Sequence, residues 1–342
     1  MRKGKNQSKE SLISINNSGH RVIIPIYIPH EEDYYKDAYK IFECCLFSIV
    51  KTSVTKLKVS VVSNNCCDPI NERLLQLQMQ GYIDELIIEK EAIGKINSIL
   101  KALKTVQERL ITITDADVLF CNGWEEAVVE IFRAFPKAGA VCPVPVFRKQ
   151  LSFTSNIWMR YLLSKQLYFR PVKNPNAMEK FAQSIGWFSL ENRFKDLICT
   201  LQAKNGTIAV LGCSHFVATY KREVFEKLPK ANSIYLLGGN SEGLYLDIPP
   251  IKMGGYRLST YDNFAFHLGN HWERWMEEKQ NEIKEIEKKE NNYIQFKKLK
   301  YSPLEYFFSF KVFEKIFQNK NIYNFILTNK GISKDKIKTF WY

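Results

Sequence analysis

The chain has 342 residues, of which 45% are hydrophobic and 13% aromatic, so it can bury a sizeable core and does not have the composition of a disordered protein. Its 49 Lys and Arg residues outnumber its 36 Asp and Glu residues, and the formal net charge of +13 favours anionic partners such as nucleotides or anionic membranes. No apolar run approaches the roughly 18 residues of a membrane-spanning helix, and the polar N-terminus lacks the apolar core of a signal peptide. The eight cysteines show no zinc-binding spacing, which indicates free thiols in a reducing, cytoplasmic compartment.

Predicted strands and helices alternate through the first half of the chain. The predicted strands cover residues 21–29, 57–63, 85–89, 109–114 and 138–147. The predicted helices between them cover residues 33–50, 70–80, 94–107 and 123–135. This alternation predicts an α/β fold with a mostly parallel sheet flanked by helices, which binds ligands beyond the carboxyl ends of its strands.

The second half of the chain is less regular. Residues 151–200 are predicted to form two helices, a helical insertion, after which the sheet pattern resumes as far as residue 270. Residues 271–292 are predicted to form a charged helix that opens a basic, aromatic C-terminal extension over 271–342. The predicted organisation is therefore a flexible segment over 1–20, one main domain over 21–270 and a helical extension.

The stretch RLITITDADVLF places Asp115 and Asp117 directly after a strand that reads as buried. Asp117 or Asn122 could cap the helix that begins near Gly123. Alternatively, the two carboxylates could hold Mg²⁺ or Mn²⁺ that carries a diphosphate. Their position at the end of a strand in a parallel-sheet pattern favours the metal.

The order of motifs over residues 21–270 resembles that of the GT-A glycosyltransferases of the family 2 type, which have a Rossmann-like fold. VIIPIY resembles the opening strand of that family, and the resemblance implies that Pro25 and Tyr27 border the nucleotide base. VVSNNCCD corresponds to the end of the second strand, where Asn64 and Asn65 replace the usual acidic residues and Asp68 lies just beyond. An Asn carbonyl can still accept a hydrogen bond from a base N–H group.

The same resemblance assigns the phosphate, metal and acceptor regions. GKINSILKAL is similar to the start of a helix that places Lys95 and Asn97 near the nucleotide. In TDADV, Asp117 is expected to ligate the metal directly, and Asp115 to contact the ribose or to reach the metal through water. His267, in FHLGN, is expected to complete the metal site.

GCSHFVATYKREVF resembles the segment that closes over the sugar and the acceptor, with Ser214 and His215 as its polar residues. A structural role is the alternative for His215. The E-D pair that family members carry before a Gly-Tyr is absent here. Asp247 is expected to be the catalytic base because it follows an apolar run, and Glu242 is the alternative. Asp247 could instead only start a turn before Pro249.

The resemblance implies a metal-dependent, inverting glycosyltransferase of bacterial surface polysaccharide or glycolipid assembly. The donor would be a nucleotide-diphosphate-sugar, with a UDP-sugar favoured, and the acceptor a saccharide or a lipid-linked saccharide. A non-catalytic nucleotide-binding scaffold with the same fold is one alternative. A phosphatase of the haloacid dehalogenase type, which shares the D-x-D strand, is another alternative. A sugar nucleotidyltransferase has a related sheet, but its Gly-rich opening is missing from this sequence.

The C-terminal tail raises a separate question of partners. Residues 279–342 contain 14 Lys against 7 Asp and Glu, together with many Phe and Tyr side chains. Such a tail could rest on the inner face of an anionic membrane, or pack its aromatic side chains on the main domain and expose its lysines to water. No nucleic-acid-binding motif is present, so nucleic acid is not an expected partner.

Overall fold

The computed structural model describes residues 4, 8–9, 11–12, 19–289, 296–317 and 319–337. Most of the N-terminal segment that was predicted to be flexible lies outside these residues. The eight cysteines are free thiols, as their spacing predicted. Within the described residues, no helix combines the length and the apolar character that crossing a lipid bilayer requires.

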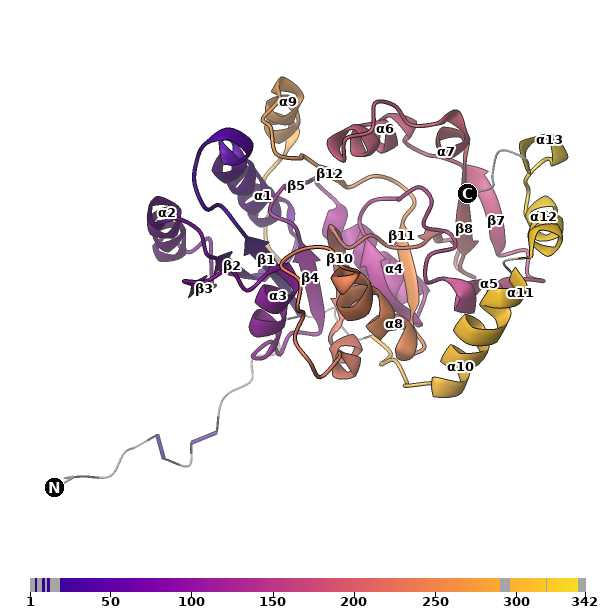
Figure 1. Ribbon diagram of the computed structural model, residues 1–342, viewed down its shortest axis with the longest axis horizontal. Helices are drawn as coiled ribbons and strands as arrows, with labels where there is room; N and C mark the ends of the chain where they lie inside the picture. Colours follow the sequence, from indigo (N-terminus) through magenta and orange to yellow (C-terminus); the bar gives the residue numbers. More distant parts are fainter. Residues whose placement is uncertain are drawn as a thin grey trace.

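A mixed sheet of ten strands, counted over the described residues, forms the centre of the protein (Figure 1). The strands are β1 (His20–Ile26), β2 (Lys58–Asn64), β3 (Glu85–Glu89), β4 (Leu110–Thr114), β6 (Ala138–Cys142), β7 (Leu167–Pro171), β8 (Leu197–Gln202), β9 (Ile208–Leu211), β10 (Val217–Lys221) and β11 (Tyr256–Thr260). Their order is β3-β2-β1-β4-β10-β6-β11-β9-β8-β7. Strands β1, β2, β3, β4, β6, β8 and β11 run in one direction and β7, β9 and β10 in the other, so the predicted α/β fold with a mostly parallel sheet is confirmed.

Helices cover both faces of this sheet (Figure 1). The helices of the first half are α1 (Ala38–Thr52), α2 (Asp68–Met79), α3 (Lys95–Leu103) and α4 (Trp124–Ala134), each within a few residues of its predicted range. Helix α3 contacts β1 and β2, whereas α4 contacts β6 and β11. Because helices lie on both faces, the central strands are buried along their length; all five residues of β4 and of β6 are buried.

Residues 151–200 contain the predicted helices α5 (Ser155–Tyr161) and α6 (Pro175–Ser184), a short α7 (Asn192–Asp196), and the strands β7 and β8. The prediction of helices alone was therefore incomplete. In β7, Leu167 and Phe169 are buried and Tyr168 between them is exposed. Two buried positions are too few to separate the two-residue period of a strand from the period of a helix, so the pattern could not reveal this edge of the sheet.

A second, two-stranded sheet pairs β5 (Val118–Phe120) with β12 (Ala265–His267). In the connection before β11 lie η2 (Arg222–Lys227), η3 (Gly243–Asp247) and α8 (Ile248–Lys252). Of the charged helix predicted over 271–292, the described residues form a shorter helix, α9 (Arg274–Glu282), and residues 290–292 lie outside the described part of the chain. The extension continues with α10 (Pro303–Phe307), η4 (Phe308–Phe313), α11 (Glu314–Phe317), α12 (Lys320–Asn329) and α13 (Lys334–Ile337). It packs on the main domain, since the rings of Phe317 and Trp158 are 4.9 Å apart.

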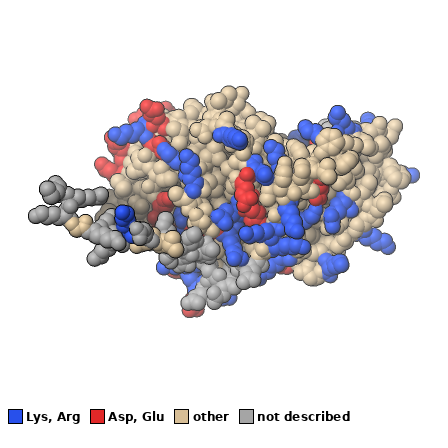
Figure 2. Space-filling model, turned by 90° about the horizontal axis from the view of Figure 1, so that it is seen from below, with Lys and Arg blue, Asp and Glu red and all other residues tan. Residues whose placement is uncertain are grey.

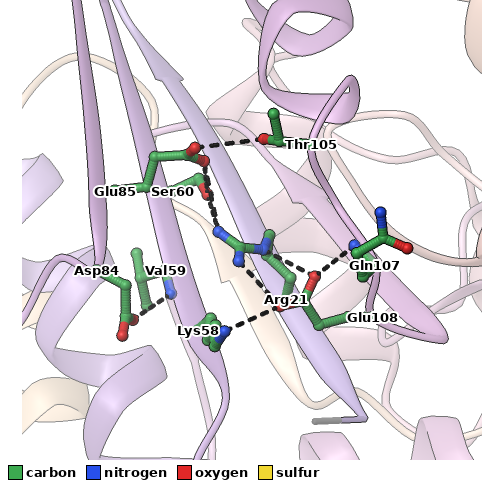
Figure 3. A network of polar contacts seen from close by, with 9 residues as sticks. All are labelled: Arg21, Lys58, Val59, Ser60, Asp84, Glu85, Thr105, Gln107 and Glu108. Carbon is green, nitrogen blue, oxygen red and sulfur yellow. Dashed lines mark hydrogen bonds and ion pairs between the residues drawn. The ribbon is translucent and has the colours of Figure 1, made fainter. Parts of the chain in front are cut away.

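An ion-pair network ties together the strands at the edge where the parallel strands begin (Figure 3). Arg21, in β1, donates two hydrogen bonds to Glu108, at 3.0 and 2.9 Å, and a third to Ser60 of β2 at 2.7 Å. Glu108 is buried, which would raise its pKa, but the hydrogen bonds and positive charge of Arg21, together with backbone hydrogen bonds, lower that pKa below the ordinary value. The network lies where the parallel strands begin, opposite the carboxyl ends beyond which sheets of this kind bind ligands.

Candidate active site

Two cavities open side by side at the edge where β1, β2 and β4 end. The first cavity has a volume of about 380 Å³ and is lined by the end of β1, by Asp117 and by Tyr34, Tyr35, Ala38 and Ile41. The second cavity has a volume of about 710 Å³ and is lined by residues 146–149, 214–216 and part of α6. Lys95, Asp115 and Leu237 line both cavities, so one continuous site crosses the end of β4.

Lys95 and Asp115 form an ion pair where the two cavities meet. The Lys95 Nζ atom lies 2.5 Å from Asp115 Oδ1. Lys95 is the first residue of α3, and its backbone N–H donates to the carbonyl of Leu236, while the backbone N–H of Asp115 donates to Phe216. Burial alone would lower the pKa of Lys95, but attraction to the Asp115 carboxylate raises it above the ordinary value. Lys95 is thus a cation held in a fixed position beside the Asp115 carboxylate.

Asp117 faces His267 because β5 pairs with β12 in antiparallel register. Val118 lies opposite His267, and the backbone N–H of Leu268 donates to the Asp117 carbonyl at 2.7 Å. The His267 Nε2 atom is then 3.5 Å from Asp117 Oδ2. Burial raises the pKa of Asp117, an effect that His267 opposes and Asp115 reinforces, and the net shift is upward. Asp117 Oδ1 is buried and has no hydrogen-bond partner among the described residues.

These residues can be tested for their fit to a divalent cation. Within the described part of the chain, no group of three His, Cys, Asp or Glu side chains is assembled as a complete set of metal ligands. However, Asp117 Oδ1 lacks a partner, and the His267 Nδ1 atom is held by Ser184 at 3.0 Å, which turns Nε2 toward Asp117. A histidine that is oriented through its second nitrogen is typical of metal sites. Asp117 and His267 therefore fit a cation whose other ligands are water and phosphate oxygens.

Aromatic side chains line the first cavity. Pro25 and Tyr27 lie at the end of β1, and both border the cavity, as do Tyr34 and Tyr35. The rings of Tyr27 and Tyr35 meet edge to face, with centroids 5.8 Å apart. Tyr27 is 44% exposed, so its ring offers a surface on which a flat heterocycle can stack.

The polar residues predicted to read the base are arranged differently from the expectation. Asn64 lines the first cavity, but its Oδ1 atom already accepts from the backbone N–H groups of Ile93, at 2.7 Å, and Gly94, at 3.2 Å. Its carbonyl is thus occupied in holding the loop before α3. Asn65 and Asp68 line neither cavity; Asp68 is an exposed residue in the first turn of α2.

A loop over residues 229–240 covers the start of α3, and the sequence analysis did not single it out. Asn97 holds the loop through Ser233, whose N–H donates to Oδ1 and whose carbonyl accepts from Nδ2, both at 2.9 Å. Gly94 has φ +86°, and a Cβ there would lie 2.8 Å from backbone atoms of Leu236. Leu236 and Leu237 line the cavities. Asn97 itself lines neither, so it positions the loop.

The second cavity combines apolar walls with a few polar groups. Ser214 and His215 line it, together with Glu242 and Lys149. Burial lowers the pKa of Lys149; Asp247 opposes this shift only in part. Glu242 lies near enough to Lys95 to raise the pKa of that lysine, so a carboxylate faces the junction of the two cavities.

Asp247 is buried beside the second cavity and lines neither one. Its carboxylate forms an ion pair with the buried Arg257, and its Oδ2 atom lies 3.5 Å from Nδ1 of His215. Burial would raise the pKa of Asp247, but Arg257 and His215 lower it below the ordinary value. Arg257 also donates to the carbonyls of Cys213 and Ser152. Asp247 therefore belongs to a buried polar cluster under the cavity floor.

A scan against protein-family models finds no match, and a search of curated proteins finds none either. Among solved structures, the chain is similar to the mannosyltransferase PcManGT from Pyrobaculum calidifontis in complex with GDP-Man and Mn²⁺, at 18% identity and a TM-score of 0.38 over 71% of this chain. It is also similar to S. aureus TarS residues 1–349, at 12% identity and a TM-score of 0.43 over 72% of this chain, and to a longer TarS structure, at 15% identity and a TM-score of 0.30 over 38%. The matched region covers 54% of the mannosyltransferase chain, 60% of the TarS 1–349 chain and 22% of the longer TarS chain. This chain therefore spans about half the length of the mannosyltransferase. At these values the likenesses decide nothing, and any functional conclusion rests on the geometry of the two cavities.

Proposed function

We propose that this chain is a glycosyltransferase that moves a sugar from a nucleotide-diphosphate-sugar to an acceptor hydroxyl. The observation that carries the proposal is the junction of the two cavities. There Lys95, Asp115, Asp117, His267 and Glu242 converge on one edge of the sheet from four separate segments of the chain. A cation, candidate metal ligands and a carboxylate that borders the acceptor side are the groups that such a transfer needs.

The first cavity would hold the nucleoside. The base would stack against Tyr27 and Tyr35, and Asn64 would contact it through its amide nitrogen, because its carbonyl is occupied. The diphosphate would then lie at the junction, within reach of the Lys95 ammonium group, and Asp115 would contact the ribose. A UDP-sugar and a GDP-sugar are the donors to compare first.

Asp117 and His267 would hold the divalent cation, Mn²⁺ or Mg²⁺. When bound, such an ion would neutralise negative charge on the leaving diphosphate. The role of the protein is to keep an unpartnered, buried carboxylate oxygen and an oriented imidazole together at the junction. Burial destabilises the charged form of Asp117 and so raises its pKa. A bound cation would offset this destabilisation of the carboxylate.

The second cavity would hold the acceptor. Phe147, Phe181 and Phe216 supply apolar wall, and Ser214 and His215 supply hydrogen-bonding groups, a combination that suits a saccharide. For the base that takes the proton from the acceptor hydroxyl, we favour Glu242 because it lines this cavity. Asp247 was the first expectation from the sequence, but it lies below the cavity surface and is held by Arg257. With Glu242 and the diphosphate on opposite sides of the anomeric carbon, a single displacement would invert its configuration.

Thermal melting with candidate donors tests the proposal. UDP, GDP, CMP and ADP are each added with and without Mn²⁺ to the wild type, to Asp117→Ala and to Asp196→Ala. Asp196 is a matched control because its carboxylate pairs with Lys336 on the surface and lines neither cavity. A nucleotide at about 100 times its Kd adds roughly 2.7 kcal/mol of stability. We expect a Mn²⁺-dependent shift for one nucleotide in the wild type and in the control, and its loss in Asp117→Ala.

A shift without any hydrolysis or transfer of the sugar from the matching nucleotide-sugar would favour the non-catalytic scaffold. No shift with any nucleotide would remove the basis of the proposal.

A further inference from the structure

Elements α10, η4 and α11 form one continuous helical segment, here called the 303–317 helix, at the lower edge of the molecule in Figure 1. Exposed positions recur along it every three to four residues, so they form one stripe that faces away from the protein. The exposed positions are Pro303, Leu304, Phe307, Phe308, Lys311, Val312, Lys315 and Ile316. Every side chain of this stripe is apolar or a lysine.

A surface helix normally exposes polar and charged side chains, whereas this stripe exposes mainly apolar ones. Leu304 is 71% exposed, and Phe307, Phe308 and Ile316 are each more than half exposed. The acidic residues of the same helix lie on its other side. Glu305 accepts two hydrogen bonds from Lys137, and Glu314 is half-buried, with a pKa that burial raises.

The inner side of the helix already has its packing partners. Ser309 is fully buried, and the rings of Phe313 and Phe317 stack 5.4 Å apart. Phe317 also contacts Trp158 and Tyr323. The exposed apolar groups therefore take no part in the packing of this helix against the described main domain, and exposed apolar groups gathered on one side typically mark an interaction surface.

Positive charge surrounds the stripe. Lys297, Lys298 and Lys300 directly precede the helix, and Lys311 and Lys315 alternate with its apolar residues. Figure 2 shows that Lys and Arg side chains outnumber acidic side chains on the face of the molecule seen from below. Aromatic and aliphatic groups interleaved with lysines suit a partner that offers negative charge next to hydrocarbon.

We propose that the 303–317 helix is a docking surface for an anionic lipid bilayer. The helix lies in the plane of the interface, with Leu304, Phe307 and Phe308 inserted at the boundary between headgroups and acyl chains. Lys311 and Lys315 contact the lipid phosphates. Contact of a second copy with the same stripe is less favourable, because a symmetric interface would gather four lysines and the stripe offers no exposed acidic side chain to balance them.

Vesicle sedimentation of the full chain tests this surface. The vesicles consist of phosphatidylcholine alone or of equal parts of phosphatidylcholine and phosphatidylglycerol. We expect binding to the anionic vesicles only, and weaker binding as the salt concentration rises. The double variant K311E/K315E should bind at least ~30-fold more weakly, because each lysine near the surface contributes about 1 kcal/mol. The variant F308S/I316S should also lose binding, since it removes inserted apolar groups without changing the charge.

The matched control is K90E/K204E, which makes the same change in net charge at two exposed lysines on other elements. It should bind like the wild type. Equal loss of binding in the control would mean that net charge alone drives binding, which would overturn the proposal. A wild type that does not sediment with anionic vesicles would overturn it as well. A wild type that dimerises in light scattering but ignores vesicles would assign the stripe to a second copy instead.

Nucleotide-induced melting shifts are recorded on the same variants. The stripe lines neither cavity, so these shifts should equal those of the wild type. The vesicle result is therefore independent of whether the chain has the proposed glycosyltransferase activity.

Discussion

His267 Nε2 lies 3.5 Å from Asp117 Oδ2, while the other oxygen of the same carboxylate is buried without a hydrogen-bond partner among the described residues. Antiparallel pairing of β5 with β12 brings these two residues together from positions 150 apart in the chain. A carboxylate in this state is unfavourable unless a cation joins it, because burial penalises its charge.

Asp117→Asn should separate the stability of the protein from its binding of metal. The raised pKa of Asp117 means that the folded protein favours the neutral side chain over the carboxylate. A neutral Asn of the same shape should therefore leave the melting temperature of the metal-free protein equal to that of the wild type or higher. The Mn²⁺-dependent part of nucleotide stabilisation should disappear. Thermal melting at neutral pH measures both effects, and a variant that keeps the Mn²⁺-dependent shift would contradict the assignment of Asp117 as a ligand.

Lys95→Met should weaken nucleotide diphosphate binding. The ammonium group lies at the junction of the cavities, and its replacement removes the cation that would contact the diphosphate and leaves Asp115 without its partner. A charge-assisted hydrogen bond contributes about 1.5–3 kcal/mol, so affinity should fall about 10- to 100-fold. Isothermal titration calorimetry with the nucleotide and Mn²⁺ measures this change. Lys95→Arg should restore part of the affinity, whereas equal losses in both variants would indicate a purely structural role.

Asn97→Ala should release the 229–240 loop from α3. The change removes the two hydrogen bonds that join Asn97 to Ser233, at a cost of about 1–3 kcal/mol. Hydrogen exchange of the loop amides should accelerate, and KM for the donor should rise more than kcat falls, because Leu236 and Leu237 would no longer be fixed at the cavity wall. Asn205→Ala, in the β8–β9 turn, is the matched control. Unchanged exchange in Asn97→Ala would show that other contacts hold the loop.

The main sheet and the position of its ligand-binding edge could be predicted from the sequence because both depend on local patterns. Apolar runs of strand length that alternate with helical stripes fix the element order, and a parallel arrangement then places the ends of the strands at one edge. That logic predicted the edge at which Asp115 and Asp117 lie, whereas Lys95 was assigned to the same edge by the family resemblance.

Contacts between distant side chains could not be predicted in the same way. The carbonyl of Asn64 is occupied by a loop 29 residues away, and Asp247 is paired with Arg257, although neither pairing has a sequence signal. Asn64 was expected to face the base because of the family resemblance, and Asp247 to face the acceptor because of that resemblance and its place after an apolar run. Only the three-dimensional packing shows which polar groups the fold itself uses.

Glu242 and Asp247 should respond differently to removal of their charge. Glu242 lines the second cavity near Lys95, whereas Asp247 is buried against Arg257. Glu242→Gln should fold like the wild type and keep its nucleotide-induced melting shift, but lose turnover by about 100- to 10,000-fold, the range of general base catalysis. Asp247→Asn should instead lose about 3–5 kcal/mol of stability, because it leaves the buried Arg257 guanidinium without a counter-charge.

The two variants are compared by chemical denaturation and by turnover of the donor that the melting experiment identifies, below the melting temperature of the weaker variant. The low pKa of Asp247 also predicts that its stabilising pair with Arg257 persists throughout neutral pH and is lost only as the pH falls through the pKa of the folded state. The excess stability of the wild type over Asp247→Asn should therefore shrink in acid. If Asp247→Asn instead folds with full stability but is inactive, while Glu242→Gln turns over normally, the base is Asp247, and the acceptor must reach below the present floor of the second cavity.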